Sequence, residues 1–174
     1  MIISPYKVND VIKRSDISTG NIFTYQTGNG TRYASLGRNN GFYYGFKLQQ
    51  ILHGIHNPIK AVITPVTSQT VDKMCVIVGY FTLDLAFDNM PQIRAYDGKS
   101  IPPFGSIIST PNFVNRDGKP HLFMNLGPSV HSERGIDLYP LSEDGNIKML
   151  EFGSLLAIRG NVNFITHEQK EKKA

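Results

Sequence analysis

Two short runs of the chain place tyrosines next to basic residues, a combination that can bind single-stranded nucleic acid. The run RYASL begins at Arg32, and the run FYYGFK ends at Lys47. Side chains alternate along a strand, so burial of the phenylalanines in FYYGFK turns Tyr43 to the opposite face together with Lys47. Burial of the alanine and leucine in RYASL likewise turns Tyr33 to solvent. Exposed tyrosine rings stack on bases, at about 1–3 kcal/mol per base, while neighbouring cations bind phosphates.

Positive charge is concentrated in the same part of the chain. The protein has 18 basic and 14 acidic side chains, and residues 1–60 contain seven of the basic and two of the acidic ones. An electropositive segment is typical of a surface that meets phosphate, although a basic solubilising surface has the same signature. Tyrosine is also a common strand residue that packs without any ligand. The predicted nucleic-acid-binding residues are Arg32, Tyr33, Arg38, Tyr43, Lys47, Lys170, Lys172 and Lys173.

Other residues with chemical potential do not complete a recognisable catalytic or metal site. His53 and His56 have the spacing of two ligands on a helical turn, but a zinc site needs more ligands than these. Asp84 and Asp88 could serve acid–base or Mg²⁺ chemistry, yet a strand that ends in a polar turn explains them equally well. Phosphate-binding loops, nucleophile elbows and dinucleotide-binding motifs are absent from the sequence. We therefore expect no enzymatic activity, no metal site and no cofactor.

The elements that position these residues are predicted to be short strands joined by tight turns. Five Asn-Gly or Asp-Gly dipeptides mark hairpin turns, and runs rich in β-branched and aromatic residues lie between them. This spacing predicts an all-β, mainly antiparallel fold, a small barrel or sandwich, with one or two short helices. Apolar spacing favours helices at 6–14 and from Leu48 to His56. The expected strands are 22–27, 32–36, 42–48, 61–66, 74–85, 92–96, 106–110, 121–126, 136–139, 147–152, 155–159 and 162–166.

Length and composition predict one domain without disulfides. The 174 residues suit a single β-rich domain at 1–165, followed by a basic C-terminal tail at 166–174. The lone Cys75 excludes an intramolecular disulfide framework and is expected to be a buried small hydrophobe. The N-terminus has no continuous apolar stretch, and the most apolar window, 74–87, is too short to span a bilayer. We expect no membrane partner and a cytoplasmic location, in the host cell if the protein is viral.

The segment EFGSLLAIRGNVNF, which begins at Glu151, resembles the closing strands of OB-fold single-stranded-DNA-binding proteins. A strand led by Gly153 ends at Arg159-Gly160, and a further strand begins near Val162. The resemblance covers about a dozen of the 174 residues and implies an OB-like barrel that binds single-stranded DNA. Bacterial members end in an acidic, partner-binding tip. This chain ends in HEQKEKKA, so the resemblance does not extend to partner recruitment through such a tip.

Two functional hypotheses follow, from different classes. The first is a non-enzymatic protein that binds single-stranded nucleic acid, with DNA expected ahead of RNA and homo-oligomerisation left open. The alternative is a viral or phage structural or assembly protein, a β-sandwich that forms homo-oligomers. Its support is the abundance of turns, the low content of charged residues and the absence of catalytic signatures. An unrecognised enzyme ranks third.

Overall fold

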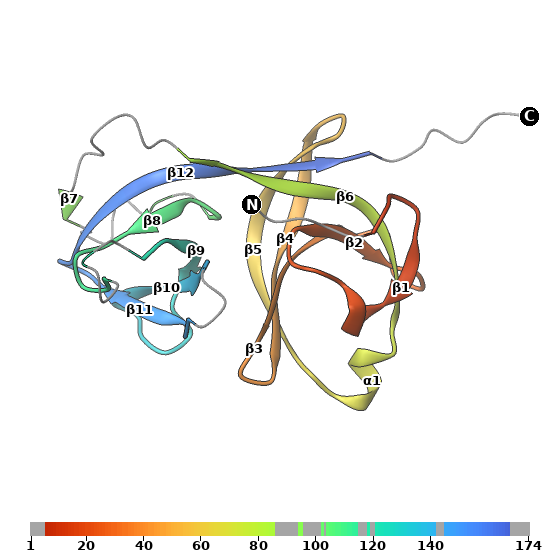
Figure 1. The fold of residues 1–174 in the computed structure, drawn as a ribbon, viewed down its shortest axis with the longest axis horizontal. Helices are drawn as coiled ribbons and strands as arrows, with labels where there is room; N and C mark the ends of the chain where they lie inside the picture. Colours follow the sequence, from red (N-terminus) through yellow and green to blue (C-terminus); the bar gives the residue numbers. More distant parts are fainter. Residues whose placement is uncertain are drawn as a thin grey trace, which may run out of the picture. The chain divides into compact units, whose positions relative to one another are not determined.

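Most of the described residues lie in strands, which pair mainly in antiparallel fashion (Figure 1). The computed structural model describes residues 6–85, 94–95, 102, 104–114, 118, 121–141 and 145–167. Within these ranges the helical elements are short: a 3₁₀ turn, η1 (Arg14–Asp16), and an α-helix of four residues, α1 (Ser68–Val71). The predicted all-β, mainly antiparallel fold with short helices is confirmed.

The chain divides into two compact units. The first unit contains residues 1–82 and 163–174, and the second contains residues 83–162. Strands of the first unit are β1 (Val11–Lys13), β2 (Asn21–Tyr25), β3 (Tyr33–Asn39), β4 (Phe42–Leu52) and β5 (Ile55–Pro65). Strands of the second unit are β7 (Arg94–Ala95), β8 (Ile107–Ser109), β9 (Phe123–Pro128), β10 (Gly135–Pro140) and β11 (Lys148–Glu151). Both β6 (Met74–Leu85) and β12 (Leu155–Thr166) contribute residues to each unit. A single domain over 1–165 stays a prediction.

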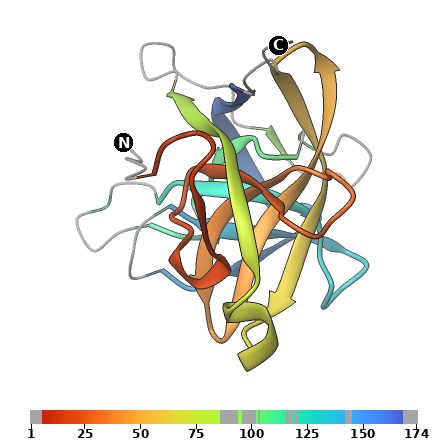
Figure 2. The same ribbon diagram turned by 90° about the vertical axis from the view of Figure 1, so that its right-hand side faces the viewer.

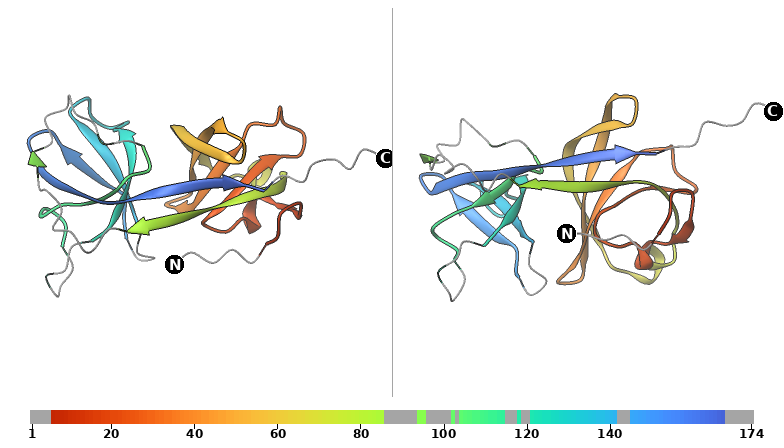
Figure 3. Two further views of the ribbon diagram at one scale, coloured as in Figure 1. Left: turned by 90° about the horizontal axis from the view of Figure 1, so that it is seen from above. Right: turned by 45° about the horizontal axis from the view of Figure 1, so that its top comes forward.

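The strands of the first unit other than β1 form a closed ring. Their order is β6-β2-β3-β4-β5-β12, and β12 also pairs with β6, so the last strand meets the first. The backbone N–H of His167 donates to the carbonyl of Val78 at 2.8 Å where these two strands meet. Figure 3 shows β6 in light green beside β12 in blue, and Figure 2 shows the other strands of this unit. A Cβ at Gly79 would collide with the carbonyl oxygen of Ile165, so this closure requires glycine.

The hairpin of β4 and β5 replaces the helix expected between Leu48 and His56. The two strands pair from Phe42–Pro65 down to Leu52–Ile55, and Gly54 turns the chain at a φ of +76°. Of the apolar residues that suggested a helical stripe, Leu48 is buried, whereas Ile51 and Leu52 are 51% and 64% exposed. The helix prediction was wrong because a positive-φ turn at Gly54 allows strand pairing to continue instead.

The other expected helix, at 6–14, was also wrong. The left-handed φ of +75° at Asn9 interrupts a helix, and its N–H donates to the carbonyl of Ile77 at 2.7 Å. Pairing with β6 then continues through β1, where Val11 opposes Val76. At the other end of the chain, the two strands expected at 155–159 and 162–166 are one strand, β12. The resemblance of this region to OB-fold proteins stays a prediction.

Each unit has its own apolar core. In the first unit, Phe164 of β12 packs against Phe46 and Phe81, with ring centres 6.1 and 5.4 Å away. A second cluster there contains Phe23 and Cys75, and the buried Cys75 is as predicted. The second unit has the strand order β12-β8-β9-β10-β11. Its core consists of Ile108, Phe123, Ile136, Leu138, Leu150 and Leu156.

Candidate functional site

A row of side chains crosses the first unit from β2 to β5. Tyr33 of β3 is opposed by Phe23 of β2 on one side and by Lys47 of β4 on the other. Lys47 is opposed in turn by Lys60 of β5. Directly opposed side chains of antiparallel strands lie on the same face, so these four residues share one face of the sheet. We call them the cationic row.

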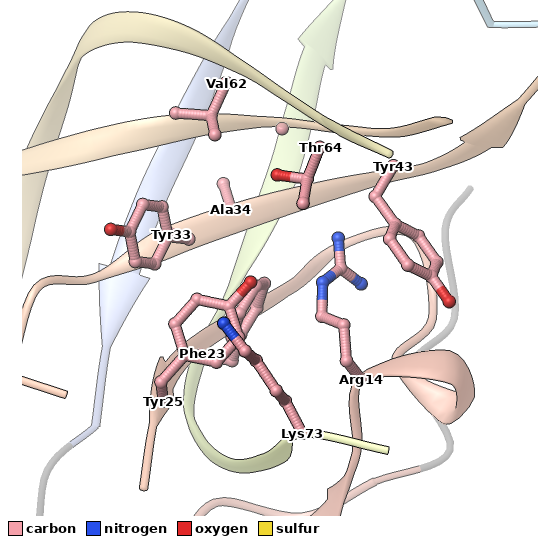
Figure 4. A pocket seen from close by; sticks show the side chains of 10 residues that line it. Arg14, Phe23, Tyr25, Tyr33, Ala34, Tyr43, Val62, Thr64 and Lys73 are labelled. Carbon is pink, nitrogen blue, oxygen red and sulfur yellow. The ribbon is translucent and has the colours of Figure 1, made fainter. Parts of the chain in front are cut away.

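A pocket lies on the same face, next to the cationic row (Figure 4). Two residues before Lys47, Gly45 opposes Val62 of β5, and Tyr43 opposes Thr64 two residues earlier still. A side chain at Gly45 would collide with the carbonyl oxygen of Ala34. Because glycine has no side chain, the backbone itself lines the pocket at this point. The pocket has a volume of about 230 Å³. It is lined by Arg14, Phe23, Tyr25, Tyr33, Ala34, Tyr43, Gly45, Val62, Thr64 and Lys73. We call it the Arg14 pocket.

Arg14 is the most unusual residue of this pocket because its charged group is buried. The side chain is only 4% exposed, and its Nε has no hydrogen-bond partner. Its Cζ lies 4.1 Å from the ring centre of Tyr43 and 4.8 Å from that of Phe23. Such cation–π contacts offset part of the cost of removing a guanidinium from water. None of the residues that line the pocket is acidic.

The backbone of η1 fixes Arg14 in this position. The N–H of Arg14 donates to the carbonyl of Lys73 at 2.8 Å, and the carbonyl of Arg14 accepts from Ile17 at 3.3 Å. The first bond ties the turn to the start of β6, so Arg14 and Lys73 reach the pocket together. Lys73 is exposed, with its Nζ 5.2 Å from the ring centre of Tyr25. The pocket therefore has one buried and one exposed cation.

Aromatic rings form one wall of the pocket. The ring centre of Tyr25 lies 5.5 Å from Phe23 and 5.6 Å from Tyr33. Burial raises the pKa of Tyr25 above its usual value, although the positive charge of Arg14 and a hydrogen bond with its side chain act in the opposite direction. The phenol is consequently neutral at physiological pH and can donate a hydrogen bond to an anion.

The structure brings some of the predicted binding residues together on one face. Tyr33, Tyr43 and Lys47 share the face that carries the pocket, as predicted, and Arg38 opposes Tyr43 across β3 and β4. The exposure predicted for Tyr43 was wrong: it is 4% exposed, because the guanidinium of Arg14 lies over its ring. Tyr33 and Lys47 are partly exposed, and Arg38 is exposed.

The remaining predicted residues lie elsewhere or cannot be placed. Arg32 lines a different recess of about 450 Å³, together with His53 and His167. Lys170, Lys172 and Lys173 lie outside the described residues.

Sequence reasoning missed three pocket residues: Arg14, Tyr25 and Lys73. Tyr25 lay on a predicted strand and could have been found by extending the tyrosine pattern to β2. Arg14 and Lys73 gave no such signal, because a 3₁₀ turn and a backbone bond between distant segments bring them to the site.

Comparisons of the chain with protein-family models, with curated proteins and with solved structures found no match. Across the described ranges, no group of three or more His, Cys, Asp or Glu side chains is arranged to hold a metal ion. The described helices are all too short to cross a membrane. The geometry of the first unit is therefore the basis for a functional proposal.

Proposed function

We propose that the protein is a non-enzymatic protein that binds single-stranded nucleic acid on the face of the first unit that carries the cationic row. The observation that carries the proposal is the direct opposition of Lys47 and Lys60 beside the partly exposed ring of Tyr33. Like charges that face each other across two strands are destabilising. Phosphates bound at this position would neutralise that repulsion.

The surroundings of the cationic row support a polyanionic ligand. Within the described part of the chain, neither lysine of the row forms an ion pair. Arg38 and the Arg14 pocket extend the positive charge along β3 and β4 from the same face. Tyr33 offers a ring on which one base can stack, and stacking tolerates any sequence because every base has a π-face. The expectation of DNA ahead of RNA rests on the resemblance of the C-terminal segment alone.

Salt-dependent binding tests this proposal. Fluorescence anisotropy with a labelled oligo-dT is measured for the natural protein and for Lys47→Gln/Lys60→Gln at two or more salt concentrations. The double variant should bind more weakly, and the slope of log K against log salt should fall by about 0.7 for each phosphate contact removed. Lys7→Gln/Lys148→Gln removes the same charge from other exposed positions and should bind almost normally. No binding of the natural protein at low salt contradicts the proposal, as does equal weakening in both double variants.

A second candidate function, an assembly protein that forms homo-oligomers, is favoured by the tip of the β4–β5 hairpin. Beyond Leu48, β4 pairs with β5 but no longer with β3, so one edge of residues 49–52 is open within the described residues. The apolar tip is exposed, with Leu52 at 64% and Ile55 at 45%. An open edge with apolar side chains can pair with the same edge of a second copy around a two-fold axis.

The oligomeric state tests this second function independently of nucleic acid. Light scattering of nuclease-treated protein should show a defined dimer or larger oligomer, and Leu52→Lys should convert it into a monomer. Val130→Lys serves as the control, since it adds the same charge at an exposed apolar position of the second unit. A natural protein that is monomeric at high concentration contradicts the assembly function and leaves nucleic-acid binding unaffected.

A further inference from the structure

The Arg14 pocket contains positive charge that its own walls do not balance. Arg14 is 96% buried, its Nε has no hydrogen-bond partner, and no lining residue is acidic. Lys73 adds a second cation at the same pocket. Removing a charged group from water is unfavourable unless a counter-charge accompanies it. The arrangement is therefore that of a site for an anion.

The guanidinium of Arg14 has a donor that its protein neighbours do not use: its Nε is without a hydrogen-bond partner, although the side chain also forms a hydrogen bond with Tyr25. The Cζ of Arg14 lies 4.1 Å from the ring centre of Tyr43 and 4.8 Å from that of Phe23, so both rings pack against the guanidinium. Figure 4 shows the guanidinium pointing from η1 toward the sheet, where Tyr43 and Thr64 lie. The planar edge of an arginine matches the oxygens of a phosphate or carboxylate, to which it donates paired hydrogen bonds. The unpartnered Nε is a donor for such a pair.

The chemistry of the pocket favours a phosphomonoester among the anions. A phosphate ester at the end of a chain carries about −1.5 to −2 charges at pH 7 and has three acceptor oxygens. Two cations with the neutral phenol of Tyr25 match that charge and that number of acceptors. A carboxylate would neutralise only one of the cations, and a neutral base would neutralise neither.

The volume of the pocket favours the end of a strand over its middle. The pocket holds about 230 Å³, which is smaller than the roughly 300–1,000 Å³ of sites for drug-sized ligands. One phosphate with part of its nucleoside fits this space, whereas an internal phosphodiester has a nucleoside on both sides. Gly45 and Val62 of the pocket lie two residues from Lys47 and Lys60, a distance of about 7 Å along the strands. The rest of the strand can therefore pass over the cationic row.

We infer that the Arg14 pocket binds the terminal phosphomonoester of a nucleic-acid strand, with Arg14 and Lys73 as its cationic partners. This inference rests on the proposed function, because the cationic row must hold the strand whose end enters the pocket. It assigns separate tasks to the two parts of the face. The row binds internal phosphates of any strand, and the pocket distinguishes a phosphorylated end from a hydroxyl end.

The test compares three oligo-dT probes of equal length, with a 5′-phosphate, a 3′-phosphate or hydroxyl groups at both ends. One of the phosphorylated probes should bind the natural protein about 10-fold more tightly than the hydroxyl probe, the effect of one charge-assisted hydrogen bond. Arg14→Gln should abolish this preference, so that the variant binds all three probes with equal affinity. Lys73→Gln, at an exposed position that does not endanger folding, should reduce the preference in the same way. Lys47→Gln/Lys60→Gln should weaken binding of all three probes and keep their ratio.

The outcomes separate this inference from the proposed function. Equal affinity of the natural protein for all three probes overturns the inference and leaves strand binding intact. A preference for a phosphorylated end that persists in both Arg14→Gln and Lys73→Gln, with circular dichroism showing folded proteins, also overturns it. Failure of the natural protein to bind any probe overturns the proposed function instead.

Discussion

Arg14 affects both the charge of the pocket in the first unit and the burial of a neighbouring tyrosine. It covers Tyr43, raises the positive charge of the pocket and has an Nε without a partner. A buried charge of this kind costs stability, and sites that bind ligands often carry such a cost. A stability cost at Arg14 is what we expect if the residue serves the anion site proposed above and not the fold.

Replacement of Arg14 by methionine tests this interpretation through stability. Met has a similar length and no charge, so Arg14→Met should leave the free energy of unfolding unchanged or raise it by about 1 kcal/mol. Urea denaturation followed by circular dichroism measures the change, and Arg38→Met, at an exposed position, is the control. A loss of more than about 2 kcal/mol would show instead that Arg14 stabilises the fold.

Cys75 predicts a dependence of stability on alkaline pH. Burial raises the pKa of its thiol from 9.0 to about 11, with the charges of Arg14 and Lys73 acting in the opposite direction. The folded state holds this proton more tightly than the unfolded state. The resulting stability is fully present below pH 9 and is lost as the pH rises to about 11. The loss should reach at most about 3 kcal/mol.

The free energy of unfolding, measured at several values across this pH range, checks the prediction. Cys75→Ala should flatten the dependence relative to the natural protein, since all other side chains are common to both. The thiol should also resist alkylation at pH 8 until the protein unfolds. Rapid alkylation of the folded protein would contradict the burial of the thiol.

At the scale of single residues, the sequence predicted which side chains share a face but not which of them stay exposed. Alternation within FYYGFK correctly grouped Tyr43 with Lys47, because it depends on local geometry alone. The cover over Tyr43 comes from Arg14, which is 29 positions away in the chain and reaches it through a 3₁₀ turn. Pattern reasoning has no access to a contact of that kind.

At the scale of elements, β4 shows how a missing side chain shapes the site. Gly45→Ala should destabilise the protein by about 2 kcal/mol or more, because the new Cβ would collide with backbone of β3, which cannot move without breaking the sheet. Thermal or urea unfolding gives the change in stability. Gly28→Ala, in an exposed turn where the new Cβ meets its nearest neighbours at 3.3 Å, should cost much less. Equal losses in both variants would count against the close approach of β3 to β4.

The turn between β3 and β4 was predicted from its sequence, whereas the turn between β4 and β5 was missed. The dipeptide Asn40-Gly41 located the turn between β3 and β4, and both residues have positive φ. The dipeptide His53-Gly54 is a weaker indicator of a turn. The helical spacing of Leu48, Ile51 and Leu52 therefore led to the incorrect prediction of a helix. Leu48 is buried on the strand, whereas Ile51 and Leu52 are exposed, so the three residues do not share one covered face.

At the scale of the whole molecule, we predict that the ring of strands in the first unit cannot form without the end of β12. Truncation after Val162 removes Phe164, which packs against Phe46 and Phe81, and removes the pairs of β12 with β5. It should cost about 3 kcal/mol or more, or prevent folding of this unit. Truncation after His167 keeps these contacts and should leave the melting temperature nearly unchanged.

The same truncation after His167 tests the predicted role of Lys170, Lys172 and Lys173 in binding. If these lysines contact phosphates, the shortened protein should bind oligo-dT more weakly and with a smaller dependence on salt. Anisotropy titrations at two salt concentrations measure both effects. Unchanged affinity and slope would remove the three lysines from the binding site and leave the cationic row as its basis.

The antiparallel β class followed from composition and turn spacing, whereas the division into two units did not. Both β6 and β12 have the sequence pattern of ordinary strands. No glycine, proline or change in composition at Thr82 or Asn163 indicates that the chain passes from one unit to the other there. Such a division depends on contacts between distant segments. It therefore becomes visible only when strand partners are known.

The participation of β12 in both units has a consequence for the order of events during translation. Residues 83–162 leave the ribosome before Phe164 and Ile165, the residues that pair with β5. Strands β2 to β6 must then wait as an open sheet while the whole second unit is synthesised. Nascent chains of this protein are accordingly exposed to edge pairing and chaperone capture until the end of β12 emerges.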